Sequence, residues 1–146
     1  MGFYVALIFL TRIPLPQFEL DEKKIASSVA FFPLVGAVIG SILWFIYTWG
    51  QYIVPSKVLA AVLVIADIAI TGGMHMDAVA DTMDGLFCYG DREKKLSVMR
   101  DSRIGAYGVI GIILLILLKY VLFSSLVDYA IPRAILIYPV LGRWVM

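Results

Sequence analysis

The chain has 146 residues, of which 62% are hydrophobic and 16% charged, with a net charge of +1 at pH 7. Soluble domains contain roughly 45–50% apolar residues, so this composition excludes an ordinary soluble protein, and the near-neutral charge gives no reason to expect a nucleic-acid partner. The single cysteine, Cys88, excludes an intrachain disulfide. Long apolar runs instead predict an integral membrane protein surrounded by lipid.

The first 50 residues predict a short surface segment and then a membrane span. Residues 2–10 are apolar but too few to cross a bilayer, and two prolines within Thr11–Pro16 prevent the helix from continuing. We therefore expect an interfacial or re-entrant N-terminal segment. The first span is predicted from about Val29 to Trp49. Gly36 and Gly40 lie four residues apart within it, a spacing that allows close contact with another helix.

The second predicted span runs from near Ser56 to about Met76 and carries one charge, Asp67, near its middle. A carboxylate at that depth costs about 2.5–3.5 kcal/mol on insertion scales, so Asp67 is a functional candidate. It either lines the cavity of a site or pairs with a polar group on another span. The Gly72-Gly73 pair either lies within this helix or ends it and starts a new one.

The most polar stretch follows, and two further spans come after it. Asp91 is predicted to cap a short surface helix whose Leu96 and Met99 face the lipid boundary. The third span is expected from the region of Gly105 and Gly108 to about Leu126. The fourth begins at Pro132, and the chain stops inside it.

Together these elements predict an all-α fold, a polytopic membrane helical bundle of about four spans, forming a single integral membrane domain over residues 1–146. Lysine and arginine set its orientation, since most of them lie in residues 11–27 and in the 85–104 loop. Both segments should therefore face the cytoplasm, in a multi-pass membrane protein. The sequence is consistent with a monomer and with a homo-oligomer.

Three aspartates stand together at the end of the second span. Asp77, Asp81 and Asp84 are spaced by four and then three residues, which puts their carboxylates on one helical face. Three negative charges that close need a positive partner, and no lysine or arginine lies between them. Mg²⁺ binds one or two carboxylates together with water and substrate phosphate oxygens. The triplet thus predicts a site for a divalent metal ion; the alternative is a solvated helix end.

Basic side chains near the triplet are candidates for phosphate binding. Arg100 and Arg103 flank Asp101, and arginine pairs well with phosphate oxygens. We favour this role for Arg103, because Gly105 and Gly108 would let a ligand approach the backbone; the alternative is a cationic flank that contacts lipid headgroups.

Two further residues have open assignments. His75, the only histidine, either binds phosphate and moves a proton or is satisfied by a neighbouring carboxylate. Arg12 either reaches the site or anchors the membrane interface.

Several segments, taken in order, carry a more specific pattern. They are Phe9–Pro16, Phe32–Gly36, Thr71–Asp77 continuing through Asp81 to Phe87, Met99–Gly108, and Gly142–Trp144. In order and spacing they resemble the cobalamin synthase family, whose members are also called adenosylcobinamide-GDP ribazoletransferases, and the resemblance spans nearly the whole chain. Members of that family continue with further membrane segments, so the resemblance implies a chain that is incomplete at its C-terminus.

The resemblance implies a Mg²⁺-dependent transferase of the cell inner (cytoplasmic) membrane that completes cobalamin. α-Ribazole or its 5′-phosphate attacks adenosylcobinamide-GDP, and GMP leaves. Carried over by position, the triplet would hold Mg²⁺ against the diphosphate, with Asp84 also catalytic. Arg103, with Arg100 or Arg12, would bind phosphate, His75 would contact substrate, and Asp101 would orient the ribazole hydroxyl or bind metal.

Two rival functions are consistent with parts of the sequence. CDP-alcohol phosphotransferases of phospholipid synthesis share the Asp-x-x-Asp-Gly core found at Asp81–Gly85, but the expected Ala-Arg three residues later is replaced here by Cys88-Tyr89. A cation transporter subunit would use Asp67 and the triplet as ion ligands along a pathway. Against this, the triplet clusters at one membrane face beside arginines, which repel cations.

Overall fold

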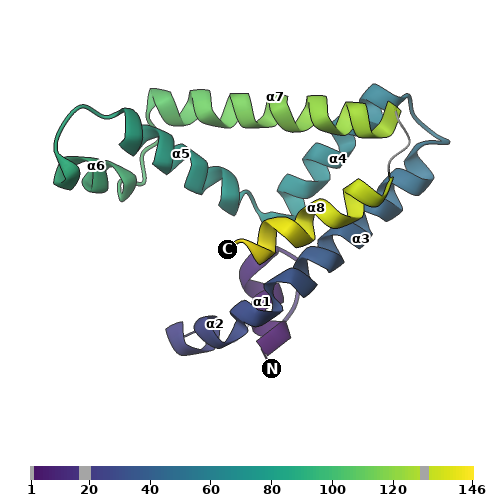
Figure 1. The fold of residues 1–146 in the computed structure, drawn as a ribbon, viewed down its shortest axis with the longest axis horizontal. Helices are drawn as coiled ribbons and strands as arrows, with labels where there is room; N and C mark the ends of the chain where they lie inside the picture. The colour runs from purple at the N-terminus through teal and green to yellow at the C-terminus, as the bar shows by residue number, and fades with distance from the viewer. Residues whose placement is uncertain (1, 17–20, 129–131) are drawn as a thin grey trace. The chain divides into compact units, whose positions relative to one another are not determined.

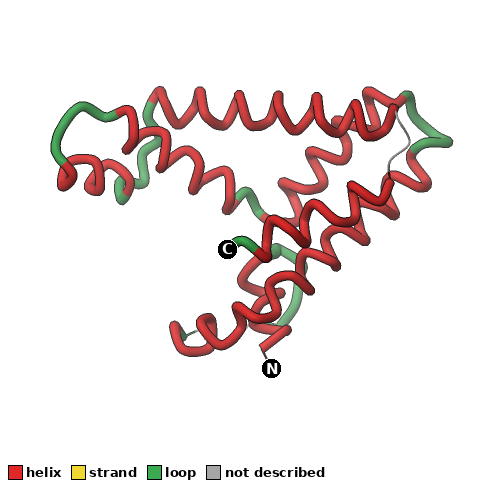
Figure 2. The backbone as a smooth tube through the Cα atoms, viewed as in Figure 1, coloured by secondary structure: helices red, strands yellow, loops and turns green. Residues whose placement is uncertain are grey.

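The chain folds into helices joined by short loops. The computed structural model describes residues 2–16, 21–128 and 132–146, and these residues contain no strand (Figure 2). Residues 17–20, part of the stretch used to predict orientation, lie outside that description. The expected all-α fold is confirmed. In chain order (Figure 1) the elements are α1 (Gly2–Leu10), α2 (Glu22–Ser28), the 3₁₀ turn η1 (Val29–Phe31), α3 (Phe32–Gly50), α4 (Ser56–Thr71), α5 (Met74–Phe87), α6 (Arg92–Met99), α7 (Ala106–Asp128) and α8 (Pro132–Trp144).

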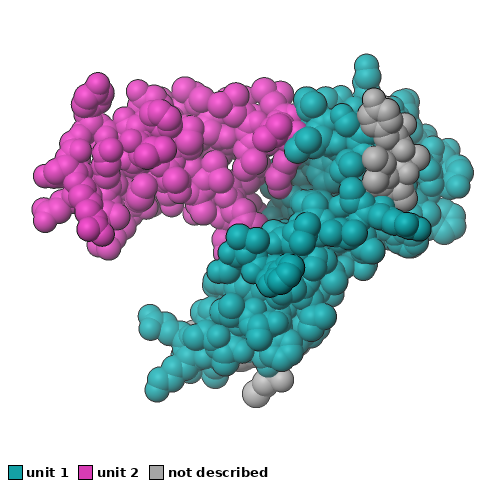
Figure 3. Space-filling view, viewed as in Figure 1, with its two compact units in different colours: residues 1–72, 120–146 teal, residues 73–119 magenta. Residues whose placement is uncertain are grey.

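Two compact units can be distinguished by the density of packing within them. One unit comprises residues 1–72 and 120–146, and the other comprises residues 73–119 (Figure 3). All three aspartates of the triplet and the Asp101–Arg103 segment belong to the second unit. The prediction of one integral membrane domain remains a prediction.

Close packing of α3 on α8 organises the first unit. A methyl group added to Gly36 would collide with the backbone carbonyl of Pro139, and one added to Gly40 would collide with that of Leu136. The two helices therefore touch backbone to backbone, as small residues four apart allow in membrane helices. The sequence-based prediction of a close helix contact at Gly36 and Gly40 is confirmed.

Membrane-spanning length is reached by fewer helices than expected. Over the described residues, two helical stretches are long and apolar enough to cross a bilayer, Glu22–Gly50 and Ala106–Val127. A third span exists if α4 and α5 together count as one broken span. Helix α8 has 13 residues, or about 20 Å of helix against a hydrocarbon core of about 30 Å. The expected four spans are therefore not confirmed.

The second expected span breaks at its glycine pair. Helix α4 ends at Thr71, and Gly72 and Gly73 follow with φ angles of 65° and 73°. Two consecutive left-handed residues cannot continue a right-handed helix, and glycine adopts them without a Cβ clash. Helix α5 starts anew at Met74, so the aspartates lie on a separate helix rather than on an extension of α4.

Asp67 is 2% exposed within α4. It lies close enough to Tyr138 of α8, in the same unit, for the two side chains to interact electrostatically. The structure thus agrees with the alternative in which Asp67 pairs with a polar group on another helix.

Candidate functional site

The three aspartates of helix α5 differ in their exposure to solvent. Asp77 is exposed, Asp81 is half-buried, and Asp84 is 8% exposed. Their spacing places them on one side of the helix, as predicted from the sequence. Among the described residues, neither the Asp77 nor the Asp81 carboxylate forms a hydrogen bond or an ion pair. These two side chains, one helical turn apart, are therefore available to a ligand.

Asp84 is engaged with the start of α7. One carboxylate oxygen accepts a hydrogen bond from the backbone N–H of Gly105 at 2.7 Å, and the other accepts one from Gly108 at 2.8 Å. The first N–H groups of a helix have no partner within the helix, so an acceptor from elsewhere satisfies them. Asp84 therefore caps the N-terminus of α7 from another helix.

Glycine is required at both donor positions. A methyl group added to Gly105 or to Gly108 would fall on the Asp84 carboxylate, and at Gly108 it would also crowd the carbonyl of Ala80. Helices α5 and α7 can approach this closely because glycine has no side chain. From the sequence we expected Gly105 and Gly108 to leave room for a ligand near the backbone. In this structure the Asp84 carboxylate occupies that room.

The loop before α7 carries a charged pair. Arg103 donates to both carboxylate oxygens of Asp101, from Nε at 3.0 Å and from Nη2 at 2.7 Å, and its backbone N–H donates to the same carboxylate. These hydrogen bonds, together with the positive charge of Arg103, lower the pKa of Asp101 from 3.8 to about 2. The Arg103 side chain is 87% exposed, so its remaining donors face outward and can bind an anion.

Asp84 and this pair border one shallow pocket of about 480 Å³, which lies entirely within the second unit. The lining residues are Asp84, Cys88, Val98, Asp101, Arg103, Ile104, Gly105, Ala106 and Tyr107. Tyr107 also stacks on Phe87, with ring centroids 5.2 Å apart. The sequence pattern assigns no site role to Cys88 or Tyr107, because each joins the pocket only through the fold.

The described residues contain no group of three or more histidine, cysteine or acidic side chains placed to hold a metal ion together. Mg²⁺ does not require such a cage, since it commonly takes one or two carboxylates and completes its octahedron with water and substrate oxygens. Asp77 and Asp81 fit that requirement, because both carboxylates are accessible and hard oxygen donors. The metal-ligand role predicted for Asp84 remains a prediction.

The other candidate residues are not among those that line this pocket. His75 is half-buried in the first turn of α5, and Arg100 is exposed at the end of α6. Arg12 belongs to the first unit, where its backbone N–H donates to Ile70 and its side chain covers Gly72. The substrate-binding roles predicted for these three residues remain predictions.

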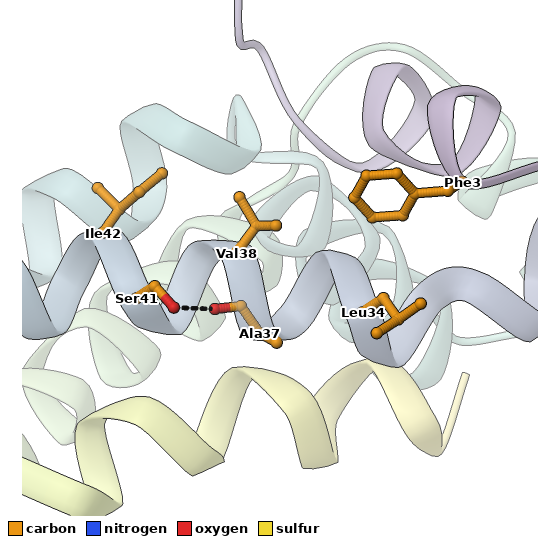
Figure 4. Close-up of a pocket in the computed structure, with 6 residues that line it drawn as sticks. All are labelled: Phe3, Leu34, Ala37, Val38, Ser41 and Ile42. Carbon is orange, nitrogen blue, oxygen red and sulfur yellow. Dashed lines mark hydrogen bonds between the residues drawn. The ribbon is translucent and has the colours of Figure 1, made fainter.

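A second hollow, in the first unit, has a different character. Phe3 and the α3 residues Leu34, Ala37, Val38, Ser41 and Ile42 line it, and the Ser41 hydroxyl donates to the carbonyl of Ala37 (Figure 4). None of its six lining residues is charged, and the Ser41 hydroxyl is the one polar side-chain group among them.

Comparison with known proteins gives a consistent result. The family of cobalamin-5-phosphate synthase matches residues 2–146. A protein of Fusobacterium nucleatum is 39% identical over 98% of this chain, one of Acetivibrio thermocellus 42% over 92%, and one of Desulfitobacterium hafniense 38% over 97%. Each of these three relatives is named adenosylcobinamide-GDP ribazoletransferase.

These matches cover 55%, 55% and 58% of the respective relatives, so the chain spans little more than half of their length. No solved structure matches it significantly.

Proposed function

Since the chain belongs to the cobalamin-5-phosphate synthase family, we propose that it forms part of the membrane transferase that joins α-ribazole, or its 5′-phosphate, to adenosylcobinamide-GDP. The ribazole hydroxyl oxygen forms a bond to the phosphorus that carries the cobinamide. The bond from that phosphorus to the bridging oxygen breaks, GMP leaves with this oxygen, and the hydroxyl proton is lost. The reaction thus replaces a phosphoanhydride bond with a phosphate ester bond.

Asp77 and Asp81 would hold Mg²⁺ in this reaction. Their two carboxylates are accessible and stand one helical turn apart on α5. When bound, the ion would neutralise charge on the diphosphate and on the departing GMP. The carboxylates would keep that charge on one face of the helix, where the substrate phosphates would arrive.

Arg103 would bind phosphate oxygens, and Asp101 would orient the Arg103 guanidinium group. Two of the guanidinium nitrogens are held by Asp101, which fixes the plane of the group and leaves its outer donors directed at solvent. A guanidinium held in this way loses little conformational freedom when it binds an anion. Because the pKa of Asp101 is about 2, the pair stays charged on both sides throughout the physiological range. The charged pair therefore keeps the Arg103 guanidinium oriented for phosphate binding, and no proton has to be transferred first.

The match of the family over residues 2–146 is the observation on which this proposal depends. It favours the proposed reaction over the two rivals considered from the sequence, a CDP-alcohol phosphotransferase and a cation transporter. We also place the protein in the cytoplasmic membrane, as the family resemblance implies, and the pocket on the cytoplasmic side, on the strength of the lysine and arginine distribution.

An assay of the purified chain in nanodiscs tests the proposal. GMP release from adenosylcobinamide-GDP is measured by chromatography with and without α-ribazole, and with and without Mg²⁺. We expect release only when both are present, together with formation of the joined cobamide. Release of CMP from CDP-diacylglycerol, or GMP release that does not depend on α-ribazole, would contradict it.

A further inference from the structure

We propose that Asp84 is a positioning residue, which fastens the start of α7 and thereby sets the Asp101–Arg103 segment in its place beside the pocket. The inference rests in part on the proposed function, because Arg103 is there assigned to substrate phosphate. The fastening itself is a property of the fold, and it can be tested without any reaction.

The two hydrogen bonds of Asp84 make a two-point attachment. Gly105 directly precedes α7 and Gly108 lies in its first turn, three residues later, and each donates to a different oxygen of the same carboxylate. A single bond would let the helix end rotate about the acceptor. Two bonds to one planar group fix both its position and its direction.

The N-terminus of α7 provides partial positive charge beside the Asp84 carboxylate. The carboxylate is 8% exposed and is not part of any ion pair among the described side chains. A buried carboxylate of this kind needs compensation. The N-terminus of a 23-residue helix supplies it, since unpaired N–H groups give a helix start a partial positive charge of about half an elementary charge. The charge of Asp84 is therefore accounted for by α7, while Asp77 and Asp81 remain without such a partner.

The contact surface is shaped around this carboxylate. Side chains are absent at both donor positions, and a Cβ at either would occupy the space of the Asp84 carboxylate. The carbonyl of Ala80, one turn before Asp84, lies against Gly108 as well. The distance between α5 and α7 therefore suits an aspartate facing two glycines. Larger side chains at the glycine positions would push the two helices apart.

The fastened turn adjoins the loop that carries the proposed phosphate-binding arginine. Gly105 follows Arg103 by two residues, and Asp84, Arg103 and Gly105 all line the same pocket. Releasing Gly105 would free the loop at one end, so that Arg103 would occupy its place for a smaller fraction of the time. Asp84 acts on substrate through the loop, without touching it.

The first test is hydrogen exchange at single-residue resolution on Asp84→Asn in nanodiscs. Asparagine keeps one acceptor oxygen but presents an NH₂ group, which cannot accept the second amide. We expect the amide of Gly105 or Gly108 to exchange about tenfold faster or more, the effect of losing one hydrogen bond to a charged group. Asp91→Asn is the matched control, because Asp91 caps α6 through a hydrogen bond from the Lys94 amide and asparagine caps equally well.

The second test separates fastening from metal binding. Mn²⁺ serves as the probe, and its affinity for the protein alone is measured by electron paramagnetic resonance. We expect Asp84→Asn to keep the wild-type affinity within about threefold, whereas Asp81→Asn should weaken it by about tenfold or more, as loss of a ligand does. If Asp84→Asn weakens Mn²⁺ as much as Asp81→Asn does, or leaves exchange at both glycines unchanged, the positioning role is refuted.

A glycine variant approaches the same contact from the other helix. Gly108→Ala keeps the Asp84 carboxylate and pushes it aside, so we expect the same faster exchange at Gly105 and the same preserved Mn²⁺ affinity. In the turnover assay both variants should raise KM for adenosylcobinamide-GDP more than they lower kcat. If the chain released no GMP at all, the proposed function would fail, and the exchange experiment would still decide the role of Asp84.

Discussion

Replacing Gly40 by alanine tests the tightest helix contact in the first unit. The added methyl group would collide with the backbone carbonyl of Leu136. A backbone atom in a helix cannot turn aside as a side-chain end can, so α3 and α8 must separate. Overpacking of this kind costs about 1–3 kcal/mol. Alanine regains about 0.5–1 kcal/mol of helix propensity relative to glycine. We therefore expect a net loss of about 1 kcal/mol, within a range of about 0–2.5 kcal/mol.

Gly142→Ala is the matched control for this prediction. Gly142 also lies in a helix, α8, but a methyl group there would meet no described atom within 4 Å. Its propensity gain should be at most about 1 kcal/mol, since helix ends benefit less. Reversible unfolding in mixed micelles, followed by tryptophan fluorescence, measures both variants. If Gly40→Ala proved as stable as Gly142→Ala, the backbone contact between α3 and α8 would not exist as described.

Two further predictions concern local electrostatics. In Arg103→Gln, the pKa of Asp101 should rise from about 2 part of the way toward 3.8, because the guanidinium hydrogen bonds and the positive charge are removed while the backbone N–H of residue 103 still donates; carbon-13 NMR of the carboxyl group would detect this. Since the lowered pKa belongs to the folded state, the pair favours folding above pH 3.8 and loses that effect as the pH falls through 2, so the variant should show a weaker pH dependence of stability than the wild type. Asp91→Ala removes the acceptor that caps α6 and should destabilise that helix by about 0.5–2 kcal/mol, seen as faster amide exchange at Lys94; unchanged exchange would contradict the cap.

Local features of the fold were predictable from the sequence. The caps of α2 and α6 follow from Asp21 and Asp91 at the start of short polar segments; the structure describes both, with hydrogen bonds from the amides of Lys24 and Lys94. Each cap joins residues three apart, so the pattern contains all the information needed. The prediction that Met99 faces the lipid boundary stays a prediction, but its contact with Gly85 of α5 could not be read from the pattern. Which face a short helix buries depends on its neighbour, which the pattern does not give.

The site was predictable in its composition and less so in its contacts. The spacing of the aspartates on α5 predicted a shared face, and Asp77 and Asp81 keep accessible carboxylates. The bonds of Asp84 join residues 21 and 24 positions apart, and no periodicity within one helix encodes them. Likewise, the spacing of Gly36 and Gly40 predicted a close helix contact but could not identify α8 as the partner, because a small-residue face fits any helix that offers an exposed backbone.

The most direct test of the account compares Mg²⁺-dependent GMP release by the wild type, Asp81→Asn and Asp91→Asn, each in nanodiscs with adenosylcobinamide-GDP and α-ribazole. Asp81 is assigned to the ion, whereas Asp91 caps α6 outside the pocket. The account predicts that Asp81→Asn loses about 100-fold or more in kcat/KM, about 2.7 kcal/mol of transition-state stabilisation, while Asp91→Asn behaves as the wild type. Equal turnover by all three proteins would contradict it.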